Sequence, residues 1–419
     1  MKIKSIKRNI LNKPKTFYDI TVDKYHNFVI GKNSKLVTHN SSLSGAMIGM
    51  AQKFKNNLPL LEGDGQFGSL RNPAPAAPRY IGARLHQNFR LIYQDFELLT
   101  NKIEEGEKIE PEFFLPIIPM VLVNGTSGIA IGFASNILNR DPFDLILACK
   151  NHLNGKETRG IKPFNSEFSG EFVRDQINPS KWHVKGKYEV KSKTIVEITE
   201  LPVSYTFESY EDILDRLEEK GIILGYDDVS RKKIHYKIKF KPAVLESLLK
   251  KRKLEDTLKI NSSETENITV IDETGNILEF TKAEDLIKRF IDVRLEWYVI
   301  RKEYLIDKLN KEITIASEKA RFIKMIIDGK LKIMKRPRTD VDSDLIKFNF
   351  VKIDNSYQYL LGMQIGTLTK EKYESLLEDI GIKELELLSV KKTNSKEFYL
   401  RDLDELEKGL KQNQKNKYN

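Results

Sequence analysis

The most constraining feature of the sequence is an unbroken helical pattern in its C-terminal third. From residue 282 to about 330, apolar residues recur at steps of three and four, namely Ile287, Phe290, Ile291, Leu295, Tyr298, Tyr304, Leu305 and Leu309. Such a stripe predicts one long helix that pairs with another helix along its length. Charged helical patterns follow over 366–389 and 396–415, after a segment that contains Pro337. Two long helices with a small insert between them predict an antiparallel coiled coil.

The N-terminal part carries a different pattern. Residues 1–40 predict short β-strands, because FYDITV (17–22) and HNFVIG (26–31) alternate apolar and polar positions. At residue 41 the spacing changes, and apolar positions over 41–56 recur as they do on a helix, with Ser41 or Ser42 suited to cap it.

The central part mixes both periods. A Gly- and Pro-rich stretch over 60–80 fits neither a regular helix nor a central strand. A helix is expected over about 81–98, and residues 115–137 predict an apolar strand, a tight turn at Asn124-Gly125 and a Gly-rich segment. Between 166 and 280 the expected elements are strands in GEFVRD, KTIVEITELP and 233–240 and a helix over 208–220.

Composition sets broader limits. The 419 residues allow roughly two to four domains, and the 31% charged and 40% hydrophobic residues are typical of a soluble globular protein. No apolar run reaches membrane-spanning length, and MKIKSIKRNI lacks the apolar core of a signal peptide. The single cysteine, Cys149, excludes an internal disulfide framework and indicates a reducing compartment. We therefore expect a cytoplasmic protein.

The charge balance leaves the partner open. Lys and Arg total 70 against 60 Asp and Glu, which gives a formal net charge of +10. This balance suits a nucleic-acid partner, because neutralising phosphates releases counterions. Lys-rich solvated helices, which fill the C-terminal third, explain the same balance equally well.

The block FYDITVDKYHNFVIGKNSKLVTHN, followed by Ser41, resembles the C-terminal motifs of inteins. The side-chain amide of Asn40 can attack its own carbonyl carbon and break the bond to the next residue. His39 is suited to polarise that carbonyl or to protonate the leaving amine, and the hydroxyl of Ser41 can accept an acyl group. The resemblance implies that Asp19 and His26 tune these steps. The competing interpretation is a polar turn between a strand and a helix.

Four stretches between residues 41 and 140 agree in order and spacing with one family. They read GAMIGMAQKF, LLEGDGQFGS, AAPRYIGARL and IPMVLVNGTSGIAIGFASNI, and a later ITELP adds a weaker match. Together they resemble the breakage-reunion domain of type IIA DNA topoisomerases, the gyrase A and topoisomerase IV A group, most closely the medium subunit of T-even-like phage enzymes. The resemblance continues through most of 41–415.

Tyr80, in Ala-Ala-Pro-Arg-Tyr, stands where this family carries its nucleophilic tyrosine. The resemblance implies that its phenol attacks a DNA phosphodiester and stores the bond energy as a phosphotyrosine. A free phenol has a pKa of about 10, so the attack needs help, and Arg79 is the expected electrostatic clamp on the phosphate. The Gly-rich loop Gly63–Gly68 permits close backbone approach to DNA. Without these flanks, Tyr80 would be expected to be a packing residue, as most tyrosines are.

Ile129, in SGIAIG, matches the family's isoleucine that inserts between base pairs and bends the cleaved DNA. The alternatives are that Ile131 has this role, or that Ile129 is a core residue at a strand edge. Five basic residues flank the same region and are candidates for phosphate contacts as a cluster: Lys53, Lys55, Arg71, Arg84 and Arg90.

The sequence shows no metal-binding pattern, because the acidic residues follow helical charge patterns and the six histidines lack ligand spacing. No P-loop is present either. The resemblance implies that Mg²⁺ is held mainly by the toprim domain, and ATP by the GHKL-type ATPase domain, of a partner subunit. The expected partners are double-stranded DNA, that ATPase/toprim subunit, another copy of this chain through a coiled-coil gate, and an N-terminal fragment with the other intein half. No membrane partner is expected.

The expected architecture is α+β and multidomain. It comprises a β-rich intein C-terminal segment (1–40), an N-terminally truncated breakage-reunion core of winged-helix type (41–150), a tower-like α/β domain (151–280) and a coiled coil with a small dimerisation globule (281–419). Because the chain begins with Met1 and shows no N-terminal intein half, we expect a split intein that splices in trans. The lack of a gyrase-type β-propeller after the coiled coil favours relaxation or decatenation over supercoiling.

Three functions remain in competition. The leading one is a subunit of an ATP-dependent type II topoisomerase that makes a transient double-strand break through a 5′-phosphotyrosine link, passes a second duplex and religates. The second is a non-catalytic DNA-binding scaffold. The third is a precursor that is active only in protein splicing.

Overall fold

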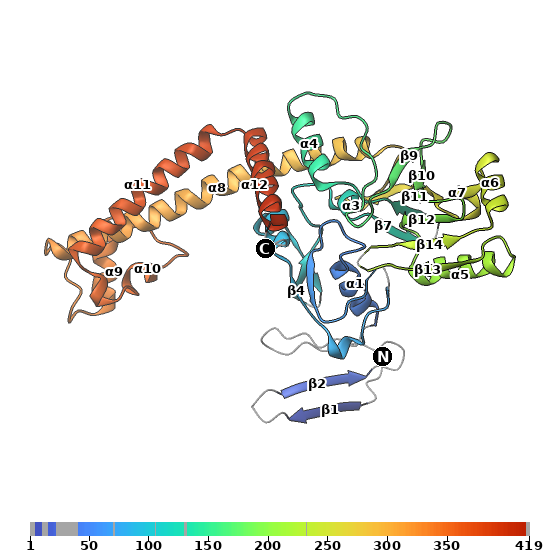
Figure 1. Ribbon diagram of the computed structural model, residues 1–419. Helices are drawn as coiled ribbons and strands as arrows, with labels where there is room; N and C mark the ends of the chain where they lie inside the picture. Colours follow the sequence, from blue (N-terminus) through green and yellow to red (C-terminus); the bar gives the residue numbers. More distant parts are fainter. Residues whose placement is uncertain are drawn as a thin grey trace. The chain divides into compact units, whose positions relative to one another are not determined.

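The computed structural model describes residues 5–10, 16–21, 41–69, 72–104, 106–129, 132–231 and 233–415 (Figure 1). The fold is α+β, as the mixed patterns predict. It divides into two compact units. The first comprises Met1–Gln94, Phe113–Ile291 and Leu403–Asn419, and the second comprises Asp95–Glu112 and Asp292–Asp402. The predicted boundaries at 40, 150 and 280 stay predictions.

The first unit begins with a hairpin and a helix. Strand β1 (Ser5–Ile10) pairs antiparallel with β2 (Thr16–Thr21), which matches the strand predicted over 17–22. The strand predicted over 26–31 lies outside the described residues. Helix α1 (Ser41–Ala51) begins at the predicted residue and ends before the predicted one.

The helix predicted over 81–98 is wrong in its first part. Residues Gly82–Leu85 form strand β4, which pairs antiparallel with β3 (Leu61–Asp64) across the Gly- and Pro-rich stretch. Helix α2 (Gln87–Ile92) then begins where His86 Nδ1 accepts a hydrogen bond from the backbone N–H of Asn88, at 3.1 Å. The turn η2 (Phe96–Leu98) follows in the second unit. Pairing with β3 therefore overrides an apolar spacing that also fits a helix.

The strand expected within 115–137 is likewise corrected. Its apolar run forms the short helix α3 (Met120–Val123). A short apolar run that is buried on several sides fits a strand and a helix alike, so periodicity did not distinguish the two. The chain then makes the hairpin of β7 (Thr126–Ile129) and β8 (Ala134–Ile137). Helix α4 (Pro142–Leu153) follows, and the Asp141 side chain caps it by accepting from the Phe143 N–H at 2.8 Å.

Two sheets form the later part of the first unit. The three-stranded sheet has the order β15 (Asn261–Thr265), β10 (Lys181–Lys185), β9 (Glu171–Arg174). The four-stranded sheet has the order β11 (Lys187–Val190), β12 (Ile195–Glu200), β14 (Tyr236–Lys239), β13 (Gly225–Asp228). The strands predicted in GEFVRD, KTIVEITELP and 233–240 correspond to β9, β12 and β14.

Helices complete this region. Helix α5 (Phe207–Glu219) matches the helix predicted over 208–220 and carries a capping box between Thr206 and Ser209. Its buried face packs with α6 (Pro242–Lys250) and α7 (Leu254–Thr257) on an apolar core that includes Tyr210, Tyr236 and Phe240. The hairpin of β16 (Ile268–Ile271) and β17 (Ile277–Phe280) leads to the long helix.

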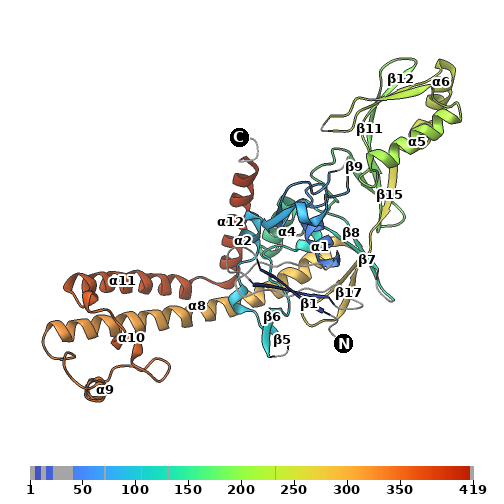
Figure 2. The same ribbon diagram turned by 90° about the horizontal axis from the view of Figure 1, so that it is seen from below.

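The second unit is built on a long helix pair. Helix α8 (Ala283–Ile327) matches the helix predicted from 282 to 330, and α11 (Lys370–Lys392) and α12 (Ser395–Lys415) match the two later patterns. Helices α8 and α11 run side by side in both views (Figures 1 and 2). Lys383 pairs with Glu312, and Lys302 donates to the carbonyl of Lys391, so the two helices are antiparallel. Supercoiling of the pair stays a prediction.

A small globule joins the two helices. Its helices are α9 (Arg338–Lys347), α10 (Gln358–Leu361) and the turn η3 (Ile365–Thr367). Its apolar core contains Phe322, Leu331, Val341, Leu345, Phe350, Tyr357 and Leu360. The hairpin of β5 (Asn101–Glu104) and β6 (Glu107–Pro111) also belongs to this unit and was not foreseen from the sequence. Within the described ranges, no helix combines the length and apolarity that a membrane span needs.

Candidate active site

The loop before the predicted nucleophile is anchored by Gln52, which directly follows α1. Gln52 is buried, and its Nε2 donates to the carbonyl of Phe67 at 2.8 Å and to that of Pro73 at 3.4 Å. The loop also closes on itself, since the Ala76 N–H donates to the Gln66 carbonyl at 2.9 Å. Gln52 thus holds the two arms of the loop, which are the backbone segments at Phe67 and at Pro73, next to the end of α1. Sequence reasoning missed this residue, because nothing local marks a contact across this sequence distance.

Gly68 allows the close approach of these two arms. Its φ is +88°, and a Cβ on this residue would lie 2.5 Å from the carbonyl oxygen of Pro73. A side chain cannot be placed there without moving the backbone. Gly68 therefore lets the loop fold on itself, and the close approach of this stretch to DNA stays a prediction.

Arg79 and Tyr80 lie on the short turn η1 (Pro78–Tyr80), directly after this loop. Tyr80 is 71% exposed, and its backbone N–H donates to the Ala77 carbonyl at 2.9 Å. The Arg79 guanidinium carbon lies 4.9 Å from the centroid of the Tyr80 ring. The exposure excludes a packing role for Tyr80 in this chain's own core, and it leaves the phenol oxygen accessible to a substrate.

Strand β4 follows the turn η1 and is held by its pairing with β3. Arg84 on β4 lies opposite Glu62 on β3, and its Nε pairs with Glu62 Oε2 at 2.9 Å. The hydrogen bond from Arg84 lowers the pKa of the Glu62 carboxyl below its ordinary value. The Arg84 side chain stays 77% exposed in this pair, and its contact with a phosphate stays a prediction.

Of the other basic residues in the expected cluster, the structure describes Lys53, Lys55 and Arg90, and all three are exposed. Lys55 lies with its Nζ 5.6 Å from the centroid of the Phe54 ring. Arg71 lies outside the described residues. Phosphate contacts by this cluster stay a prediction.

Ile129 ends strand β7 and lies opposite Ala134 of β8. It is 94% exposed, so it is not the core residue that was the alternative for this position. Its competitor Ile131 lies outside the described residues. An apolar side chain held out at the end of a hairpin has the shape of a wedge. Its role toward DNA stays a prediction.

The predicted splicing residues are described only in part. Asp19 lies on β2, opposite Lys7 of β1. Ser41 is the first residue of α1, whereas His26, His39 and Asn40 lie outside the described residues. Their roles stay predictions.

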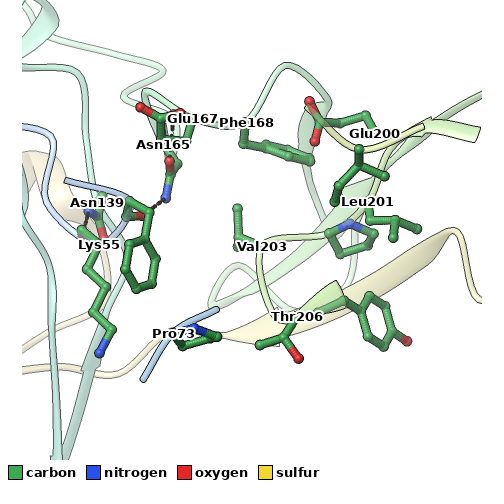
Figure 3. A pocket seen from close by; sticks show the side chains of 14 residues that line it. Lys55, Pro73, Asn139, Asn165, Glu167, Phe168, Glu200, Leu201, Val203 and Thr206 are labelled. Carbon is green, nitrogen blue, oxygen red and sulfur yellow. Dashed lines mark hydrogen bonds between the residues drawn. The ribbon is translucent and has the colours of Figure 1, made fainter. Parts of the chain in front are cut away.

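A cavity of about 350 Å³ opens beside Pro73 in the first unit, and Figure 3 shows its lining. Lys55 and Asn139 lie on one side of it, with Phe168 and Glu200 on the other. The buried Glu200 carboxylate accepts hydrogen bonds from the N–H and hydroxyl of Ser169, at 2.8 and 2.6 Å. None of the predicted catalytic residues lines this cavity, so the cleavage chemistry does not account for it.

Among the residues that the structure describes, no three His, Cys, Asp or Glu side chains gather as a group that could hold a metal ion. These residues do not fit a magnesium site by themselves.

The chain was compared with known protein families. The family model that describes the A subunits of DNA gyrase and topoisomerase IV matches residues 29–405. The match begins inside the predicted intein segment and overlaps it over residues 29–40.

Individual relatives agree with this match. The chain is 34% identical over 393 residues to the DNA topoisomerase medium subunit of Enterobacteria phage T4, covering 92% of this chain and 87% of that subunit. It is 32% identical over 410 residues to DNA topoisomerase 2 of Penicillium chrysogenum, covering 87% of this chain and 25% of that enzyme. It thus spans about a quarter of the fungal enzyme and most of the phage subunit.

Among solved structures, the DNA-binding, cleavage and re-ligation domain of Plasmodium falciparum topoisomerase II matches with a TM-score of 0.85 and 31% identity. The match covers 90% of this chain and 56% of that one. Sequence and fold agree over most of the chain. The chain therefore belongs to the family of DNA gyrase and topoisomerase IV A subunits, the cleavage subunits of type II topoisomerases.

Proposed function

We propose that this chain is the DNA-cleaving subunit of an ATP-dependent type II topoisomerase, with Tyr80 as its nucleophile. One observation carries the proposal: an exposed tyrosine stands beside an arginine, on a short turn whose preceding loop is anchored by a buried glutamine. The family to which the chain belongs supports it. An exposed nucleophile on an anchored loop can meet a large substrate such as duplex DNA without a conformational change of its own.

The proposed reaction is a reversible transesterification. The phenol oxygen of Tyr80 forms a bond to a DNA phosphorus, while the bond from that phosphorus to the neighbouring 3′ oxygen breaks. The phenol loses its proton and the 3′ oxygen gains one, so the products are a 5′-phosphotyrosine and a free 3′ hydroxyl. The reverse reaction reseals the strand and needs no external energy. Arg79, as a permanent cation, stabilises the charge that builds up on the phosphate oxygens.

Ile129 has a separate task in this proposal. It enters between two base pairs and bends the duplex, so that unstacking is offset by a larger wrapped surface. Its 94% exposure supports this role, because a side chain in the core has no access to DNA. Positive charge on the chain, +10 in all, supports attraction to the phosphate backbone.

The remaining parts of the reaction belong to partners. Mg²⁺ held by a toprim domain would supply further charge stabilisation, and an ATPase domain would drive passage of the second duplex. Both lie on a partner subunit. A second copy of this chain cuts the other strand and joins through the globule, where Met334 and Ile365 are 76% and 75% exposed. We place the protein in the cytoplasm, in line with its single, buried Cys149.

The test is denaturant trapping of the covalent intermediate. The full chain, reconstituted with its ATPase/toprim subunit, is incubated with end-labelled duplex DNA and quenched with detergent. We expect DNA attached to this chain, and we expect Tyr80→Phe to abolish it. Tyr226→Phe is the matched control, since that hydroxyl already donates to Asp215 at 2.7 Å. An adduct that survives Tyr80→Phe would favour another nucleophile, and no adduct in the wild type would favour the non-catalytic scaffold.

For residues 1–40 we propose protein splicing, on the pattern of Asp19, His26, His39, Asn40 and Ser41. The family match over 29–40 supports the competing possibility that the topoisomerase chain continues through this junction. Incubation with a matching N-terminal intein fragment, followed by intact-mass measurement, separates them. Splicing predicts a product that lacks residues 1–40 and is lost in Asn40→Ala. A chain that keeps its full mass in both cases excludes splicing.

A further inference from the structure

The β7–β8 hairpin, which carries Ile129, has little of its own to hold it in place. All four residues of β7 are exposed, and of the residues in the two strands Ile137 alone is buried. A hairpin of this length is not stable in isolation. The direction of Ile129 must therefore be set where β8 joins the rest of the first unit.

The first connection is a backbone bridge between Asn136 and Asn267. Each backbone N–H donates to the other residue's carbonyl, at 2.9 and 2.8 Å. The side chains add two more bonds: Asn136 Nδ2 donates to the Thr265 carbonyl at 2.7 Å, and Asn267 Nδ2 donates to the carbonyl of Ala134. The outer edge of β8 is thus tied to the segment between β15 and β16.

The second connection is the carboxylate of Glu266, the residue next to Asn267. It is 7% exposed and accepts from three donors. Its Oε1 accepts from the Leu138 backbone N–H at 3.0 Å, and its Oε2 accepts from Arg140 Nη2 at 2.7 Å and from Trp182 Nε1 at 3.3 Å. Two of the three donors lie on the chain that leaves the hairpin, and the third lies on β10.

Arg140 holds the carbonyl of Leu138, whose backbone N–H is held by Glu266. It is fully buried, and its Nη1 donates to the Leu138 carbonyl at 2.5 Å. Its guanidinium carbon lies 5.9 Å from the centroid of the Trp182 ring. A buried arginine needs a buried partner charge, and Glu266 supplies it. The backbone of Leu138 is therefore held at both its N–H and its carbonyl by one ion pair.

We propose that Glu266, together with Asn267, is the positioning element that fixes the β7–β8 hairpin and thereby aims Ile129 at DNA. The inference rests on the proposed function, in which Ile129 enters the duplex. Glu266 is buried, so in this proposal it affects DNA through the hairpin and not by direct contact. An ion pair suits this task because its geometry admits one arrangement, whereas apolar packing of so exposed a hairpin would admit several.

Three variants separate positioning from general stability. Glu266→Gln keeps the size of the side chain but replaces one acceptor oxygen with a donor, so it cannot accept from all three partners. Asn267→Ala removes the bond to Ala134 from an exposed residue, so it spares the core. Glu171→Gln is the matched control, because it removes a carboxylate from an exposed position on β9 of the same sheet that contains β15.

The first measurement is amide hydrogen exchange in the full chain without DNA. We expect exchange in β7 and β8 to become about tenfold faster in Glu266→Gln and in Asn267→Ala, while β12 and β14 keep their protection. Glu171→Gln should match the wild type. If Glu266→Gln does not fold, Asn267→Ala decides the matter alone. Unchanged exchange of the hairpin in the folded variants overturns the proposal.

The second measurement is the bending of a duplex labelled at both ends with a donor and an acceptor dye, with affinity measured in parallel. We expect Ile129→Ala and Glu266→Gln each to lower the bent fraction about fivefold, with affinity changed less than about twofold because phosphate contacts dominate it. The double variant should bend no less than either single one, since both changes act on one wedge.

The outcomes distinguish this inference from the proposed function. If Ile129→Ala bends DNA normally, or the wild type does not bend it, the wedge role fails and hydrogen exchange alone decides whether Glu266 positions the hairpin. If Ile129→Ala loses bending but folded Glu266→Gln keeps it, the wedge role stands and the positioning role of Glu266 is wrong.

Discussion

The guanidinium carbon of Arg79 lies 4.9 Å from the centroid of the Tyr80 ring, and both side chains are exposed. The ring's negative face holds the cation next to the phenol, where it meets any phosphate that approaches the hydroxyl. The contact places the Arg79 guanidinium beside the proposed nucleophile.

We predict that Arg79→Ala slows formation of the covalent adduct by about 10²–10³-fold, because one preorganised donor to the phosphate is lost. Arg79→Lys should fall between this variant and the wild type, since lysine keeps the charge but not the planar fork. Single-turnover cleavage by the reconstituted enzyme measures both. The melting temperature should not change, because the side chain is exposed. An alanine variant that cleaves at the wild-type rate would remove Arg79 from the mechanism.

The loop before Tyr80 gives a second prediction. Gly68→Ala should destabilise the loop by about 1–3 kcal/mol and slow cleavage, because the new Cβ would lie 2.5 Å from the Pro73 carbonyl at a positive φ. Gly82→Ala is the control, since nothing lies within 4 Å of its Cβ position. Limited proteolysis of residues 63–77 and the adduct assay measure the two effects. Equal behaviour of the two variants would contradict the assigned role of Gly68.

A third prediction concerns a buried network in the second unit. Asp402 accepts a hydrogen bond from the Tyr298 hydroxyl at 2.6 Å and pairs with Arg301, which also pairs with Asp95 at 3.4 Å. Asp402→Ala should lower the free energy of unfolding by about 3 kcal/mol, because the buried donors lose their charged partner. Chemical denaturation of the full chain measures the change.

The control for this network is Asp307→Ala, which removes an exposed carboxylate from α8, the helix that carries Tyr298 and Arg301. We expect it to change the free energy of unfolding by less than about 0.5 kcal/mol. Similar losses in the two variants would show that Asp402 is no more than a surface charge.

A fourth prediction is a pH dependence that arises at Glu407. Hydrogen bonds from Lys150 and then Lys411 lower the pKa of its carboxyl from 4.5 to about 2. The ionised form therefore stabilises the folded chain above pH 4.5, and this contribution is lost as the pH falls from 4.5 toward 2. The melting temperature of the wild type should exceed that of Glu407→Gln by a constant amount above about pH 5, and the gap should close in acid.

Glu405→Gln, on the same helix but exposed, should show no such pH-dependent gap. A gap for Glu407→Gln that persists at pH 2 would mean that the carboxylate does not act through its charge.

Local periodicity predicted the elements whose signal is complete within a short window. Helix α8 follows from its three- and four-residue spacing, and α5 from its spacing and its Thr206 cap. The segment 81–98 has helical spacing too, yet Gly82–Leu85 became a strand because β3 offered it hydrogen-bond partners. Whether such a segment forms a strand or a helix depends on a pairing partner, here β3, that lies outside the segment itself.

Some residues of the candidate site could likewise be predicted from the neighbouring sequence, and others could not. Tyr80, Arg79 and Ile129 could be named from their flanking residues. Gln52 and Glu266 could not, because their contacts span up to 21 and up to 128 positions of sequence and leave no local pattern.

The sequence by itself thus determined the long helices, the principal strands of the first unit and the stretch that holds the proposed nucleophile, since each depends on residues close together in the chain. Only the tertiary structure decided that Tyr80 and Ile129 are exposed and that Arg140 meets Glu266. These facts depend on which distant segments come together as the chain folds, and that choice is made by burial and hydrogen bonding across the whole unit.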